Sequence, residues 1–135
     1  MRLKENKFVS DGKSLVSIEK SSKIIDARVK AAVDAIGGFK RIIKQGDSVL
    51  IKPNYVFPSP PPCTTSLDFL LAVINQCYKS GASKIIVGES AAWWVSTEST
   101  MKKFGIIEAV EKTGAKIVLF DKGNWVKVKI NTPVI

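Results

Sequence analysis

The chain has 135 residues, of which 45% are hydrophobic and 24% charged, a length and balance that suit one globular domain with its own core. Its formal net charge is +9, yet 18 of its 21 basic residues are lysines rather than the arginines that make bidentate contacts with bases, so we expect no nucleic acid among its partners. No apolar run approaches the roughly 20 residues of a membrane span and no secretory signal is visible, so we expect a cytoplasmic protein that binds no membrane.

The first third of the chain predicts little regular structure before one helix. Residues 1–13 are polar and predict a lead-in or a short edge hairpin, and residues 15–18 predict a short strand. Asp26 is placed to cap a helix over residues 27–36, because apolar residues recur there at i, i+3, i+4 and i+7. One further helical turn is expected over residues 39–44.

The middle of the chain alternates strands and helices. Residues 49–51 are an uninterrupted apolar run, typical of a strand buried on both faces. A proline-rich connector follows, and then a helix is expected over residues 67–80, with Thr65 or Ser66 as its cap. Residues 84–88 form a second apolar run, which predicts a second buried strand.

The last third continues the same alternation. A helical stretch begins at Ser96 or Thr97, breaks at Gly105 and ends near residue 113, and residues 116–120 predict a strand. Residues 126–130 alternate apolar side chains with lysines, which predicts a strand with one wet face that pairs antiparallel with its neighbour.

This order of elements predicts an α/β fold with three layers. We expect a mostly parallel sheet with helices on both faces and an antiparallel edge strand. Residues 1–135 are interpreted as a single α/β domain. Because the chain stops just after a predicted strand, we expect it to be the N-terminal part of a longer protein.

The polar residues after the first buried strand form the first candidate site. They are Lys52, Asn54, Thr64, Thr65 and Ser66. A lysine supplies a point charge, hydroxyl groups donate hydrogen bonds, and the start of the predicted helix offers free backbone N–H groups, so this set suits a small anion. The alternative is structural, with Lys52 solvated, Asn54 in a turn and Thr65 or Ser66 only capping the helix.

Gly88, Glu89 and Ser90 follow the second buried strand and form the second candidate site. If the two strands are neighbours, both loops open on the same carboxyl edge of the sheet, where ligands of open α/β sheets bind. Gly88 would let the backbone approach a ligand, and Glu89 could bind a sugar hydroxyl, a metal or Lys52 itself. A purely structural ion pair between Lys52 and Glu89 is the alternative.

Trp93 and Trp94 stand together in a predicted loop of small polar residues. They could stack on a ligand ring or cover the site, but exposed tryptophans are enriched in protein interfaces. We therefore favour a contact with another domain or subunit.

Several kinds of chemistry are excluded by residue types that are missing. The chain has no histidine, which rules out Ser-His-Asp and Cys-His mechanisms. Cys63 and Cys77 are its only cysteines, so the chain has no complete metal or iron–sulfur site of its own, and its cofactor is left unknown. The two standard glycine-rich nucleotide-binding motifs are missing: the chain has no Gly-x-x-x-x-Gly-Lys-Ser/Thr loop, and no Gly-x-Gly-x-x-Gly follows a predicted strand.

A series of short strings resembles the family called domain of unknown function 362. The strings are Val16-Ser17-Ile18, Ala35–Phe39, Gly46–Asn54, Thr64-Thr65, Lys79–Ala82, Ile86–Ser90, Phe104–Ile106 and Gly114–Lys116. The resemblance implies an association with ferredoxin-like iron–sulfur segments, and so a C-terminal or ferredoxin-like partner domain outside this chain, or a second subunit. It also implies a distant similarity to the N-terminal domain of nickel-pincer lactate racemases, which bind a nicotinate-derived nucleotide. Carried over, it points to Lys52, Asn54, Thr65 and Glu89.

These observations lead to one functional hypothesis and two alternatives. The first is that the domain binds a small anionic ligand, a phosphate, nucleotide or carboxylate, at the carboxyl edge of its sheet, as part of a redox-associated protein. The second is an isomerase-like enzyme that uses Lys52 and Glu89 as acid and base. The third is an interaction module without chemistry that docks through Trp93 and Trp94.

Overall fold

The computed structural model of the chain describes residues 8–20 and 24–129. The strands are β1 (Val9–Ser10), β2 (Lys13–Ser14), β3 (Ser48–Ile51), β4 (Lys84–Glu89) and β5 (Lys116–Leu119). The helices are α1 (Ile25–Asp34), α2 (Leu67–Lys79), α3 (Thr97–Lys103) and α4 (Ile106–Glu111), with single 3₁₀ turns at Phe39–Arg41 and Phe120–Lys122. Within this part of the chain no helix has both the length and the apolar character needed to cross a membrane.

The central sheet has the order β3-β4-β5, and both of its strand pairs are parallel. Ile51 lies opposite Val87, and Glu89 lies opposite Leu119, so the carboxyl ends of the three strands meet at one edge. The α/β class and the parallel sheet predicted from the sequence are confirmed. Antiparallel pairing occurs in a separate hairpin, in which β1 pairs with β2, as predicted for the first residues.

Helix α2 is the centre of the helical layer. Its apolar residues recur on one side, and Leu70, Ile74 and Cys77 are buried against the sheet and the other helices. Ser66 occupies its N-cap position, as expected, although the side chain makes no capping hydrogen bond. Gly105, in a left-handed conformation with φ of 66°, separates α3 from α4, as the sequence predicted.

Helix α1 begins two residues earlier than expected, so Asp26 lies in its first turn and is not its cap. The Asp26 carboxylate instead accepts hydrogen bonds from Asn75, Gln76 and Lys79 of α2, at 2.7, 2.9 and 3.3 Å. Burial alone would raise the pKa of Asp26, but these hydrogen bonds outweigh it and hold the pKa below its ordinary value. The residue predicted as a cap therefore fastens α1 to α2.

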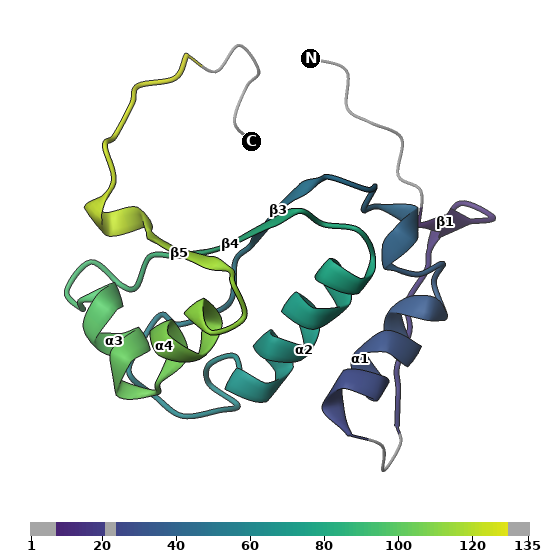
Figure 1. The fold of residues 1–135 in the computed structure, drawn as a ribbon, viewed down its shortest axis with the longest axis horizontal. Helices are drawn as coiled ribbons and strands as arrows, with labels where there is room; N and C mark the ends of the chain where they lie inside the picture. Colours follow the sequence, from purple (N-terminus) through teal and green to yellow (C-terminus); the bar gives the residue numbers. More distant parts are fainter. Residues whose placement is uncertain (1–7, 21–23, 130–135) are drawn as a thin grey trace.

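The prediction of a covering layer on the second face of the sheet is wrong for the described residues. Figure 1 shows α1 to α4 on the same side of the sheet. On the other face Leu50 and Val118 remain exposed. The uninterrupted apolar runs correctly predicted strands, but such a run says nothing about which part of a protein covers each face.

Two predicted strands are also absent. Residues 15–20 follow the hairpin without pairing with the central sheet, and residues 124–129 form no strand, so β5 has no antiparallel neighbour among the described residues. After β5 the 3₁₀ turn at Phe120–Lys122 leads the chain away from the sheet, as Figure 1 shows in yellow. Residue 130 of the second predicted strand lies outside the described residues.

Candidate functional site

Lys52 and Glu89 meet at the carboxyl edge of the sheet. Lys52 directly follows β3, and Glu89 is the last residue of β4, its parallel neighbour. The Lys52 Nζ lies 2.7 Å from the Glu89 Oε1, which makes both a hydrogen bond and an ion pair. The expectation that the two loops open at the same edge is therefore confirmed for these two side chains.

The Glu89 carboxylate is fully buried, with 0% of its side chain exposed. Besides Lys52, it accepts hydrogen bonds from the backbone N–H of Tyr55, at 3.0 Å, and from its neighbour Ser90, at 2.8 Å. Buried carboxylates are tolerated when they are paired and hydrogen-bonded in this way. With three donors on two oxygens and no access to solvent, Glu89 joins the ends of β3 and β4.

The Lys52 side chain is 57% exposed, in contrast to its partner. Its ammonium group also donates to the Pro53 carbonyl oxygen at 3.3 Å. An ammonium group carries three N–H donors, and the contacts within the described residues occupy two of them. Glu89 thus fixes the position of Lys52 and leaves a donor and an exposed surface for a ligand.

The polar groups of Asn54 and Thr65 mostly bind each other. The Asn54 N–H donates to Thr65 Oγ1 at 2.9 Å, and the Thr65 N–H donates to the Asn54 carbonyl oxygen at 3.0 Å. The Asn54 side-chain amide donates to the Cys63 carbonyl oxygen at 3.1 Å. Thr64 is buried and donates to the Ser59 carbonyl oxygen at 2.8 Å. These bonds hold the proline-rich connector between β3 and α2, called here the proline-rich loop, against the start of α2.

A pocket of about 480 Å³ lies beside this loop, between β3 and the first half of α2. Of the eight predicted site residues, Lys52, Asn54 and Thr65 line it. The rest of its wall is apolar and consists of Ile51, Pro53, Phe69, Leu70 and Val73. The pocket therefore combines one charged group, two hydroxyl or amide side chains and an apolar wall.

The other predicted site residues lie outside this pocket. Ser66 is at the N-cap of α2 and Ser90 follows Glu89, where its hydroxyl donates to the Ala91 carbonyl oxygen at 3.4 Å. Gly88 is covered by a phenyl ring, because a Cβ atom there would lie 2.3 Å from Cζ of Phe120. The small size of Gly88 thus serves packing within the sheet rather than the approach of a ligand.

Sequence reasoning missed Tyr55. This residue is buried, its N–H donates to Glu89, and its hydroxyl has no hydrogen-bond partner within the described residues. Burial, together with the negative charge of Glu89, raises the pKa of the Tyr55 phenol to about 12. Its position two residues after Pro53, where the chain leaves the strand, was the only signal that it could contact the site.

Trp93 and Trp94 lie at the same edge. The Ala92 N–H donates to the Val56 carbonyl oxygen at 3.1 Å, which holds the two loops together. The Trp93 and Trp94 rings pack edge to face at 5.2 Å, and the Phe57 ring lies 5.8 Å from Trp94. We call Phe57, Trp93 and Trp94 the aromatic cluster. Trp93 is 92% exposed and Trp94 60%, so most of this apolar surface faces solvent.

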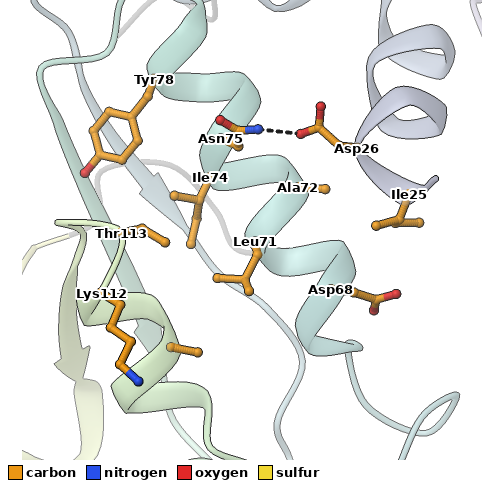
Figure 2. A pocket seen from close by; sticks show the side chains of 11 residues that line it. Ile25, Asp26, Asp68, Leu71, Ala72, Ile74, Asn75, Tyr78, Lys112 and Thr113 are labelled. Carbon is orange, nitrogen blue, oxygen red and sulfur yellow. Dashed lines mark hydrogen bonds between the residues drawn. The ribbon is translucent and has the colours of Figure 1, made fainter.

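A larger cavity, of about 760 Å³, crosses the outer side of α2 between α1 and α4 (Figure 2). Its floor is apolar, with Leu71 and Ile74 pointing into it. Its rim carries three charged side chains: Asp26 binds Asn75, as the dashed line in Figure 2 shows, Lys112 binds Glu108, and the exposed Asp68 accepts a hydrogen bond from the Phe69 N–H. Because this cavity lies between helices, whereas ligands of open α/β folds bind at the carboxyl edge of the sheet, we place the candidate site at Lys52.

The two cysteines of this chain do not lie together as ligands of an iron–sulfur cluster. Cys63 is exposed in the proline-rich loop, whereas Cys77 is buried in the core on α2. Over the ranges 8–20 and 24–129, no group of three or more His, Cys, Asp or Glu side chains is placed to hold a metal ion. A cluster of the kind implied by the resemblance would need ligands from another polypeptide segment.

Comparison with known proteins identifies one family. The model of the family described as "Domain of unknown function (DUF362)" matches residues 49–134. This span begins in β3 and includes both Lys52 and Glu89. No curated protein and no solved structure matches the chain significantly.

Proposed function

The chain belongs to the DUF362 family, and we propose that its domain binds a small anionic ligand, a phosphate, nucleotide or carboxylate, through the ammonium group of Lys52. The observation that carries this proposal is the position of Lys52. A fully buried carboxylate holds it at the wall of a pocket of about 480 Å³, while more than half of its side chain stays exposed. A lysine that is only a solvated surface residue needs no buried carboxylate to fix its position.

The place of the pocket in the fold favours the same function. It lies at the carboxyl edge of a parallel sheet, the usual position of ligands in open α/β folds. The N-terminus of α2 also faces this loop, and its first backbone N–H groups add a partial positive charge. Asp68, in the first turn of α2, opposes part of that charge.

The geometry favours binding over isomerase-like catalysis. A general base has to reach the proton that it removes, and Glu89 is fully buried with both carboxylate oxygens engaged in three hydrogen bonds. In the proposed function Glu89 therefore positions Lys52, and Lys52 binds the ligand.

Thermal unfolding in the presence of candidate anions tests the proposal. The panel holds inorganic phosphate, mononucleotides, nicotinate nucleotides and small carboxylic acids. A ligand at ~100 times its dissociation constant is expected to stabilise the wild-type protein by about 2.7 kcal/mol. The stabilisation should disappear in Lys52→Met, which keeps the length of the side chain but removes its charge.

The matched control is Lys84→Met. Lys84 is an exposed lysine at the opposite end of β4, so its loss changes the net charge equally without touching the pocket. We expect this variant to respond to the ligand like the wild type. Equal stabilisation of Lys52→Met and the wild type would contradict the proposed function.

A second candidate function is protein docking through the aromatic cluster, favoured by the exposure of both tryptophans. Rings of this size, exposed together, are typical hot spots of interfaces. We propose that the partner is a second copy of this chain, which can be tested with the chain alone.

In the cell, the partner that the family resemblance implies is a cytoplasmic iron–sulfur protein that carries its own cluster ligands.

Sedimentation velocity over a range of protein concentrations tests docking between two copies. The wild type is expected to self-associate, and the double substitution Trp93→Ser and Trp94→Ser should weaken association at least tenfold. Trp125→Ser is the control, because Trp125 is 82% exposed but lies outside the cluster. A wild type that remains monomeric, or an equal effect of both variants, would argue against the second subunit.

A further inference from the structure

We propose that the ligand of the Lys52 pocket is a monocarboxylate with an apolar body rather than a phosphate or a nucleotide. This inference rests on the proposed function, because it specifies the anion that Lys52 binds. It follows from two properties of the pocket, the charge beside it and the character of its wall.

The charge at the pocket is too small for a phosphate dianion. Among the described residues that line it, Lys52 alone is charged, and the Glu89 carboxylate 2.7 Å away partly compensates its positive charge. Phosphate has three acceptor oxygens and close to two negative charges, and its sites supply several cations or a cradle of N–H groups. One partly compensated ammonium group, together with the N-terminus of α2, whose partial charge Asp68 opposes, matches a single negative charge better than two.

The available hydrogen-bond donors lead to the same choice. Asn54 and Thr65 line the pocket and bind each other: the Thr65 hydroxyl accepts a hydrogen bond from the Asn54 N–H, and the Thr65 N–H donates to the Asn54 carbonyl oxygen. The Asn54 amide is bound to the Cys63 carbonyl oxygen. Within the described residues, the side-chain donors left at the pocket are one N–H of Lys52, the O–H of Thr65 and the second N–H of the Asn54 amide, whereas the phosphate chain of a nucleotide would need more.

The wall of the pocket suits an apolar body. Ile51, Leu70 and Val73 come from the core side of β3 and α2, and the ring of Phe69 forms the outer side. Phe69 is 45% exposed, so part of its ring is free to be covered. A volume of about 480 Å³ lies within the range of small-molecule sites, roughly 300–1,000 Å³, and exceeds what a carboxylate group alone would fill. The rest of the ligand would therefore contact apolar side chains.

Isothermal titration calorimetry with acetate, butyrate, hexanoate and inorganic phosphate tests this inference. If the chain of the ligand enters the pocket, affinity should rise by up to about fourfold for each added methylene group. Hexanoate should bind at least tenfold more tightly than phosphate. Affinity that does not depend on chain length, or phosphate binding more tightly than hexanoate, would overturn the inference.

Substitutions at Phe69 and Lys52 distinguish the contribution of the apolar wall to binding from that of the positive charge. Phe69→Ala should reduce the difference in affinity between hexanoate and acetate at least threefold. Phe57→Ala is its control, since Phe57 is similarly exposed, at 43%, but belongs to the aromatic cluster. Lys52→Met should abolish binding of all the carboxylates, and Lys52→Arg, which keeps the positive charge, should retain it.

The outcomes distinguish this inference from the proposed function. Phosphate or nucleotide binding that is lost in Lys52→Met would support the proposed function and overturn the inference that the ligand is a monocarboxylate. No binding of any of these anions to the folded wild type would overturn both. Length-dependent carboxylate binding that requires Lys52 and Phe69 would support both.

Discussion

Replacing Glu89 by alanine is expected to lower the free energy of unfolding by about 3–5 kcal/mol. The ion pair itself contributes the smaller part, because Lys52 is more than half exposed and solvent weakens the attraction. The larger part comes from the backbone N–H groups of Tyr55 and Ser90, which lose their acceptor at 3.0 and 2.8 Å and are left without a replacement. The empty volume left in the core adds to the loss.

The melting temperature measured by circular dichroism should fall by roughly 10–20 °C in this variant. Glu98→Ala is the matched control. Glu98 also binds two donors, the ammonium groups of Lys102 and Lys122, but on the surface of α3, so its loss should shift the melting temperature much less. If both variants melted at the same temperature, Glu89 would not be the structural centre of the sheet edge.

Raising the pH from 10 to 12 is expected to remove about 2 kcal/mol of stability through Tyr55 alone. Burial and the nearby Glu89 charge raise the pKa of this phenol from 10.0 to about 12 in the folded protein. Below pH 10 the phenol is protonated in both the folded and the unfolded state, so its contribution is fully present. Between pH 10 and 12 the unfolded state releases the proton first, and stability is lost as the pH rises.

Tyr55→Phe isolates this contribution from that of the many lysines, which also titrate above pH 10. Urea unfolding at pH 8, 10, 11 and 12 should show a shallower loss of stability in the variant than in the wild type. At pH 8 the variant should be at least as stable, because the Tyr55 hydroxyl is buried and has no hydrogen-bond partner in the part of the chain that the structure describes. Parallel profiles of the two proteins would show that Tyr55 does not titrate in this way.

The pairing of Lys52 with Glu89 could be predicted from the sequence for a simple physical reason. Two apolar runs joined by a helix predict parallel neighbouring strands, and the residues that follow such strands lie at one edge. The chemistry at that edge was harder to predict. Thr64 and Asn54 have the residue types of a binding site, but the structure uses them to fold the proline-rich loop.

The apolar wall of the pocket could not be read from the sequence. Phe69 and Val73 lie on α2. Helical periodicity separates buried from exposed positions, but it cannot identify a partly exposed side chain that lines a pocket. The open face of the sheet was missed for a related reason. Leu50 and Val118 belong to apolar runs that correctly predict strands, whereas their exposure depends on whether another element lies above them.

The most direct test of anion binding at Lys52 is a titration of the ¹⁵N-labelled wild-type protein with hexanoate, followed by two-dimensional NMR. Binding at this pocket predicts saturable shifts of the backbone amides of Thr65, Phe69 and Val73, all absent in Lys52→Met. The amides around Lys84 and Lys116, at the opposite end of the sheet, should not move. Shifts spread over the surface lysines, or gathered around Leu71 and Asn75 at the cavity in Figure 2, would contradict a binding site at Lys52.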